Sequence, residues 1–272
     1  MDTKVKLKFK DQFAYFCGDA GGSMINLLID MYILTFCTYV LGIDAAWMAG
    51  LFLFARIWDA INDPLIGSLP DRFRIGKSGD KFKPYVKISM IPLAISVLMI
   101  FADISGWNDF AKHVWVAVAY ILYGTSYTGT SMPYGAMASV ITDDPIERTK
   151  LSRARSIGGT AVGLIFLPIV SLMIWNSDQT ANAQGFFKVA VIAAVVSLIF
   201  YSCLILFSKE RIHESTEKKA DIPKYSFFHV LKLSLTNRPL IGVMIASMGG
   251  IIANAANGSL ASYLYKPELF TG

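Results

Sequence analysis

Long runs of apolar residues, separated by short polar gaps, dominate the chain. A helix needs roughly 20 residues to cross about 30 Å of membrane hydrocarbon. Seven runs reach that length, and each predicts a membrane-spanning helix: 13–41, 44–69, 85–103, 114–141, 156–175, 186–207 and 240–265. The seventh follows a long charged segment. The pattern predicts an all-α transmembrane protein with a six-helix bundle at 1–208, a linker at 209–239 and a seventh helix within 240–272.

Lys and Arg are concentrated in alternate gaps. They precede the first predicted helix, follow the second, fourth and sixth, and are sparse in the other gaps. Because cytoplasmic loops carry the excess of Lys and Arg, we predict a cytoplasmic N-terminus, a cytoplasmic linker and a multi-pass protein of the plasma (inner) membrane. Six helices, a charged linker and one further helix resemble half of a larger assembly, so we also expect the chain to be truncated.

The composition agrees with a lipid environment. Hydrophobic residues make up 54% of the chain and charged residues 17%, against about a quarter charged in soluble domains. The net charge of +5 does not indicate a nucleic-acid partner, because the basic residues lie between the apolar runs. The three cysteines lie inside apolar runs without metal-ligand spacing. Since no nucleophile–base pairing is evident either, we expect no cofactor and no enzymatic activity.

The second predicted helix carries charges where charges are costly. Its sequence Ala-Arg-Ile-Trp-Asp-Ala-Ile-Asn-Asp-Pro places Arg56, Asp59, Asn62 and Asp63 within an arc of roughly 120°. An ionisable residue at mid-bilayer costs about 2.5–3.5 kcal/mol and usually serves a function. Carboxylate and amide oxygens suit a hard cation or a proton. We therefore predict a cation site; the alternative is an Arg56–Asp59 ion pair that only orders packing.

Polar stripes also run along three other predicted helices. On the first, Asp19, Ser23, Asn26 and Asp30 fall within roughly 60° of one another. This face lines a water-filled path or meets another polar helix. On the fourth, hydroxyl groups on one side would bind a sugar or serve as packing: Tyr120, Tyr123, Tyr127, Thr128, Ser131 and Tyr134. The seventh carries a weaker stripe of Asn254 and Asn257.

Several motifs resemble one transporter family. The segment Arg56-Ile-Trp-Asp-Ala-Ile-Asn-Asp-Pro-Leu-Ile-Gly67, followed by Asp71-Arg72 and Lys81-Phe-Lys-Pro-Tyr85, resembles the glycoside–pentoside–hexuronide:cation symporter family of the major facilitator superfamily. Supporting motifs are Gly18-Asp-Ala-Gly21, Tyr127-Thr-Gly-Thr-Ser-Met-Pro133, and Glu147-Arg-Thr-Lys-Leu151 with Arg155. The resemblance covers essentially the whole chain.

The resemblance implies one half of a twelve-helix transporter that works by alternating access. Its sugar would lie near the midplane between two bundles. The coupling cation, Na⁺ or H⁺, would be bound by Asp59, Asp63, Asn62 and Thr128. A gating or structural role is implied for Arg56 within the second helix and, at helix ends, for Gly67, Asp71, Arg72 and Lys83.

The predicted sugar site departs from the melibiose branch of that family. Where this branch has two sugar-binding aspartates and a tryptophan, the matching positions here are Ser23, Ser131 and Gly135. We therefore expect a neutral glycoside or pentoside instead of an α-galactoside, with Asp30 as a replacement anchor. The predicted substrate-binding residues are Asp19, Ser23, Asn26, Asp30, Tyr127, Ser131, Arg155 and Asn254. The alternatives are a lysolipid transporter of the same fold and a membrane sensor or scaffold without transport.

Overall fold

The chain folds into helices that form two compact units, Met1–His213 and Glu214–Gly272. The computed structural model describes residues 7–73, 75, 79–176, 180–211, 236–239, 241–242, 245–246 and 249. The first unit contains α1 (Phe9–Thr35), the π-helical turn η1 (Phe36–Val40), α2 (Ala45–Arg72), α3 (Lys83–Ile100), α4 (Asp109–Ile141), α5 (Pro145–Ile174) and α6 (Ala183–Phe207). In the described part of the chain, β-structure is limited to an isolated bridge between Trp175 and Ala181. The all-α prediction is confirmed.

The predicted seventh helix falls in the second unit. Its described positions between 241 and 249 are helical. The rest of 240–265, including Asn254 and Asn257, lies outside the described residues. Most of the predicted linker 209–239 also lies outside them.

Four helices of the first unit are long and apolar enough to cross a membrane: α1 together with η1, α3, α5 and α6. The other two, α2 with 28 residues and α4 with 33, are of similar length. They are less apolar, because α2 carries Arg56, Asp59 and Asp63, and α4 contains the run 124–131 of Gly, Ser, Thr and Tyr. A helix can be polar on one side at membrane depth when that side faces other helices or a water-filled cavity.

The helices start where short polar side chains cap them. The carboxylate of Asp44 accepts hydrogen bonds from the backbone N–H groups at the start of α2, and Asn108 caps α4 in the same way. Asp144 accepts a hydrogen bond from the Ile146 N–H, and Pro145 occupies the first position of α5, where its missing N–H costs nothing. We predicted that this helix starts at residue 156. That start was wrong, because the capped polar segment 145–155 continues the helix beyond its apolar run.

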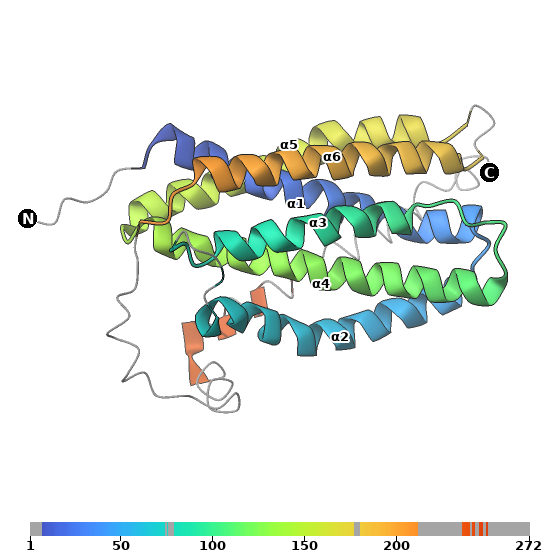
Figure 1. Cartoon of the computed structure of the whole chain (residues 1–272), viewed down its shortest axis with the longest axis horizontal. Helices are drawn as coiled ribbons and strands as arrows, with labels where there is room; N and C mark the ends of the chain where they lie inside the picture. Colours follow the sequence, from blue (N-terminus) through green and yellow to red (C-terminus); the bar gives the residue numbers. More distant parts are fainter. Residues whose placement is uncertain are drawn as a thin grey trace, which may run out of the picture. The chain divides into compact units, whose positions relative to one another are not determined.

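The helices pack as two neighbouring groups, α1 with α5 and α6, and α4 with α2 and α3 (Figure 1). α1 packs against α5 and α6, α3 packs against α4 and α6, and α2 lies beside α4. Glycine allows a close approach of α1 and α5, because a Cβ atom at Gly158 would collide with the backbone oxygen of Phe16. Reciprocal hydrogen bonds join α1 to α4: Tyr15 Oη donates to the Tyr134 carbonyl at 3.0 Å, and Tyr134 Oη donates to the Tyr15 carbonyl at 2.6 Å.

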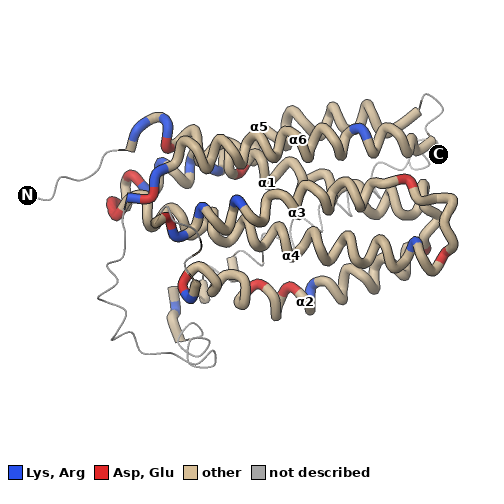
Figure 2. Tube along the Cα trace, in the orientation of Figure 1, with Lys and Arg blue, Asp and Glu red and all other residues tan. Residues whose placement is uncertain are grey.

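Lys and Arg gather at the end of the bundle where α1 and α3 begin and where α4 meets α5 (Figure 2). A buried carboxylate, Glu210, organises this end. Its oxygens accept hydrogen bonds from the backbone N–H groups of Lys81, Phe82 and Lys83 at the start of α3, where the helix dipole favours negative charge. Next to it, Arg211 Nη2 donates to both carboxylate oxygens of Asp11 at 2.9 and 2.7 Å. The last residues after α6 thereby tie α6 to α1 and α3.

Candidate functional site

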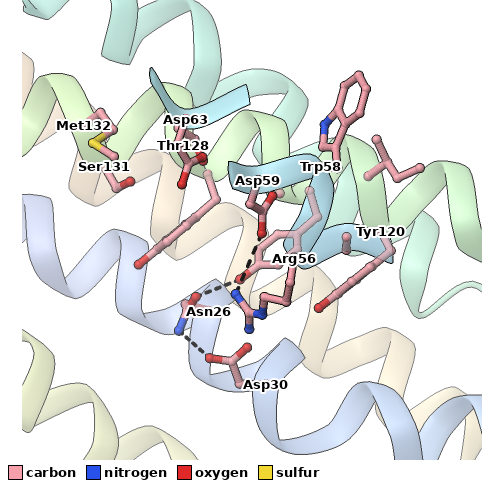
Figure 3. A pocket seen from close by; sticks show the side chains of 15 residues that line it. Asn26, Asp30, Arg56, Trp58, Asp59, Asp63, Tyr120, Thr128, Ser131 and Met132 are labelled. Carbon is pink, nitrogen blue, oxygen red and sulfur yellow. Dashed lines mark hydrogen bonds and ion pairs between the residues drawn. The ribbon is translucent and has the colours of Figure 1, made fainter. Parts of the chain in front are cut away.

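A polar cavity of about 220 Å³ lies between α1, α2 and α4 (Figure 3). Its position is near the middle of α2 and α4, far from the ends of these helices. The polar and charged side chains that line it come from all three helices: Asn26, Asp30, Arg56, Trp58, Asp59, Asp63, Tyr120, Tyr123, Tyr127, Thr128 and Ser131. Most residues that the sequence predicts for the cation and sugar sites therefore line a single cavity.

The two acidic residues near the middle of α2, Asp59 and Asp63, face α4. The Thr128 hydroxyl donates a hydrogen bond to Asp63 Oδ1 at 2.7 Å (Figure 3). Asp59 lies one turn earlier against the backbone of α4, since a Cβ atom at Gly124 would be 3.3 Å from Asp59 Oδ1. The two carboxylates and one hydroxyl thus place oxygen atoms along the interface of α2 and α4, and oxygen is the ligand type that hard cations prefer.

Arg56 forms a loose ion pair with Asp59. Its Nη1 lies 3.7 Å from Asp59 Oδ2, and its side chain is 75% exposed. A direct charge-assisted hydrogen bond would be about 2.7–2.9 Å long. The alternative in which this pair only orders packing does not account for Asp63, which lines the same cavity and has a different partner.

Asn62 lies apart from the other predicted cation ligands. It is not among the residues that line the cavity. Its amide Nδ2 is buried and has no hydrogen-bond partner in the described part of the chain. The 100° spacing along α2 puts Asn62 on the same broad face as Asp59 and Asp63, but the packing of α4 determines which of these side chains reach the cavity.

The α1 wall of the cavity is joined to α4 by a chain of hydrogen bonds. Tyr123 Oη donates to Asn26 Oδ1 at 2.7 Å, and Asn26 Nδ2 donates to Asp30 Oδ2 at 2.7 Å. The rings of Tyr120, Tyr123 and Tyr127 pack on one another with centroids 5.8–5.9 Å apart. The tyrosine stripe therefore packs as a row, and all three rings also line the cavity.

Three predicted substrate residues form a separate cluster between α1 and α5. Arg155 Nε donates to Asp19 Oδ1 at 2.9 Å, and Ser23 Oγ donates to Asp19 Oδ2 at 3.4 Å. The Arg155 guanidinium lies over the Tyr134 ring, 5.1 Å from its centroid, in a cation–π contact. None of Asp19, Ser23 and Arg155 lines the cavity. The polar stripe of α1 is thus divided: Asp19 and Ser23 belong to the cluster with Arg155 of α5, and Asn26 and Asp30 line the cavity.

Of the predicted gating or structural residues, Arg56 lines the mid-helix cavity, and the others lie at the basic end of the bundle. Asp71, close to the end of α2, forms an ion pair with Lys81 at 2.8 Å. Lys83 Nζ donates to the Ser208 carbonyl after α6. Gly67 and Arg72 are on the last two turns of α2. Sequence reasoning missed Glu210, the carboxylate at the centre of this network. Its only signal was an acidic residue directly after an apolar helix, which is too common to be diagnostic.

A helical bundle with a polar cavity at mid-helix is the architecture expected for one half of a major facilitator fold. Residues 14–267 match the family model described as MFS/sugar transport protein. The chain belongs to this family, which confirms the resemblance to the glycoside–pentoside–hexuronide:cation symporters drawn from the motifs.

Known relatives agree with the family assignment. The isoprimeverose transporter of Lactiplantibacillus pentosus is 31% identical over 97% of this chain and 54% of its own length. The uncharacterized symporter YjmB of Bacillus subtilis is 30% identical over 99% of this chain and 57% of its own length. The inner membrane symporter YicJ of Escherichia coli is 32% identical over 76% of this chain and 44% of its own length. The chain spans about half the length of these curated relatives.

Proposed function

We propose that the protein couples the uptake of a sugar to a cation, Na⁺ or H⁺, by alternating access. One observation carries the proposal: the paired carboxylates of α2, Asp59 and Asp63, line a cavity at mid-helix together with the Thr128 hydroxyl. The names of the relatives, an isoprimeverose transporter and two symporters, support the same function.

The charge of the α2 carboxylates explains how a cation would promote sugar binding. Two carboxylates one turn apart repel each other, and a low-dielectric surrounding strengthens that repulsion. A bound cation relieves it and fixes α2 against α4 through Asp59, Asp63 and Thr128. Thermodynamic linkage then requires that the sugar raises cation affinity by the same factor by which the cation raises sugar affinity.

The remaining cavity wall has the chemistry of a sugar site. Amide, carboxylate and hydroxyl groups of Asn26, Asp30 and Ser131 can hydrogen-bond sugar hydroxyls, and the rings of Tyr120 and Tyr127 offer a stacking surface. Asp19 and Arg155 neutralise each other, which favours a neutral glycoside or pentoside over an anionic one.

The proposal is tested by uptake into proteoliposomes that contain the protein expressed from its complete reading frame. Labelled isoprimeverose, xylose and melibiose are supplied under a Na⁺ gradient and under a H⁺ gradient in separate experiments. We expect accumulation of at least one sugar under one gradient. Asp59→Asn should reduce that accumulation at least about tenfold, because coupling factors between sites are typically 5–150-fold.

A matched control removes a carboxylate far from the cavity. Asp109, at the start of α4, has a side chain that is 90% exposed, and Asp109→Asn should accumulate sugar as the wild type does. If Asp59→Asn also accumulates sugar normally, the cation assignment is wrong. A wild type that accumulates none of these sugars under either gradient favours a sensor or scaffold.

A second cavity supports lysolipid transport as the second candidate function. It has a volume of about 280 Å³, lies between α1, α5 and α6, and its described lining residues are all apolar. An acyl chain would fit such a surface, but the lining offers no polar group to bind a head group. Labelled lysophosphatidylcholine separates the candidates, since a lysolipid transporter should move it across the vesicle membrane and a sugar symporter should not.

A further inference from the structure

Three carboxylates and one cation share the polar cavity. Of the described residues that line it, Asp30, Asp59 and Asp63 are acidic and Arg56 is basic. Asp63 has the Thr128 hydroxyl as a partner. Arg56 is thus the positive group available to two carboxylates on different helices, Asp59 on α2 and Asp30 on α1.

The position of Arg56 is intermediate between these two carboxylates. Its Nη1 is 3.7 Å from Asp59 Oδ2, whereas the arginine pairs elsewhere in this unit, Arg155–Asp19 and Arg211–Asp11, have contacts of 2.9 and 2.7 Å. Figure 3 shows the Arg56 guanidinium between the Asp59 and Asp30 side chains. Because its side chain is 75% exposed, little packing would oppose a change of partner.

Asp30 is built into the α1 wall as an acceptor. One of its oxygens, Oδ2, accepts a hydrogen bond from Asn26, which in turn accepts one from Tyr123 on α4. Tyr120 lines the same cavity as Arg56, Asp30 and Asp59. A guanidinium that moved to Asp30 would therefore act on the same side chains that are proposed to meet the sugar.

We propose that Arg56 is a shared counter-ion that pairs with Asp59 when the carrier has no cation and moves to Asp30 when a cation binds Asp59 and Asp63. This inference rests on the proposed cation site. A cation on Asp59 takes over the role of Arg56 and repels its positive charge. Asp30 gives that charge a new partner, so the carboxylate on α1 strengthens cation binding on α2 and transmits cation occupancy to the sugar-facing wall.

The test is a double-mutant cycle read on Na⁺ binding alone, without sugar. Na⁺ titrations by calorimetry compare the purified full-length wild type, Asp30→Asn, Arg56→Gln and the double variant. Asp30→Asn should weaken Na⁺ binding about 5- to 20-fold, within the usual range of coupling between sites. In the Arg56→Gln background the same change should have less than about a twofold effect, because coupled residues are non-additive.

The opposite pattern overturns the proposal. If Asp30 acts only as a nearby negative charge, Asp30→Asn weakens Na⁺ binding at least as much without Arg56 as with it. Asp109→Asn is the control for loss of a carboxylate and should bind Na⁺ as the wild type does.

Should Arg56→Gln fail to fold, as judged by thermal unfolding, Arg56→Lys is used instead. A lysine keeps the positive charge but not the reach of a guanidinium fork. In the Arg56→Lys background, the effect of Asp30→Asn on the Na⁺ dissociation constant should therefore be at least about twofold smaller than in the wild type. An undiminished effect contradicts the proposal.

The proposed function and this inference fail in different ways. A wild type that takes up neither Na⁺ nor a proton on titration contradicts the cation site itself. If the wild type takes up a proton instead of Na⁺, the same cycle is read on proton uptake with a pH indicator. A wild type that binds its cation, combined with additive effects of the two substitutions, leaves the proposed function intact and removes only the role of Arg56 and Asp30.

Discussion

At the scale of single residues, short hydrogen bonds across helix interfaces fix the groups that line the polar cavity. Thr128 holds Asp63 from α4, and Tyr123 holds Asn26 in the same way. Asp59 has the loose partner Arg56. This arrangement fixes the orientation of Asp63 and Asn26, whereas Asp59 is held only by a long ion pair.

Substitution of Thr128 by valine should weaken cation binding. Valine has nearly the shape of threonine but no hydroxyl, so Asp63 loses a hydrogen bond of a type that contributes about 1.5–3 kcal/mol. This corresponds to roughly a tenfold or larger increase in the Na⁺ dissociation constant, measured by titration of the purified protein. Thr128→Ser keeps the hydroxyl and should stay within a few-fold of the wild type. Equal binding by both variants would show that this hydroxyl is not part of the cation site.

At the scale of helices, close backbone contacts hold α1 between α5 and α6. Gly158 brings α5 against the backbone of α1, and the Ser197 hydroxyl of α6 donates to the Gly21 carbonyl at 2.8 Å. Small residues at such contacts allow helices in a membrane to approach closely and gain van der Waals energy. These contacts position the α1 stripe that carries Asp19 at one end and Asp30 at the other.

Substitution of Gly158 by alanine should destabilise the bundle. The added Cβ would collide with the Phe16 carbonyl, and overpacking of this kind typically costs about 1–3 kcal/mol. Gly163 on the same helix is the control, because its nearest neighbour, Leu27 Cδ1, would lie 3.9 Å from a new Cβ. Thermal unfolding in detergent should therefore show a lower midpoint for Gly158→Ala and an unchanged or higher one for Gly163→Ala. A midpoint that falls equally in both variants would contradict this account of the packing.

At the scale of the whole molecule, basic residues mark one end of the six-helix unit (Figure 2). The loop between α3 and α4 lies at the opposite end of α4 from the turn that joins α4 to α5. From the positive-inside rule we predict that the end with Asp143 and the first turn of α5 is cytoplasmic and that the end with Gly106 is external. The proposed direction of the cation and sugar gradients depends on this orientation.

Cysteine labelling in intact cells tests that orientation. Single cysteines are introduced at Gly106, where a side chain meets open space, and at the exposed Asp143, in a background without the three native cysteines. A membrane-impermeant maleimide should label Gly106→Cys in intact cells and Asp143→Cys only after permeabilisation. The reverse pattern would invert the topology and place the N-terminus outside.

The sequence by itself determined the helices and the chemistry of the second one. Apolar length predicts spans because lipid leaves backbone polar groups no partner outside a helix, and all six predicted spans of the first unit are helices. The 100° rotation per residue placed Asp59 and Asp63 on one face, and both line the cavity. These features are local, since they depend only on residues within a few turns of one another.

Only the tertiary structure decided which polar groups meet. Asp19 and Asp30 belong to one stripe of α1, yet Asp19 pairs with Arg155 of α5 whereas Asp30 lines the cavity with α2 and α4. Periodicity gives the direction in which a side chain points from its own helix, but its partner depends on which neighbour lies there. For the same reason no spacing rule could place Glu210 at the start of α3, more than a hundred residues away in the chain.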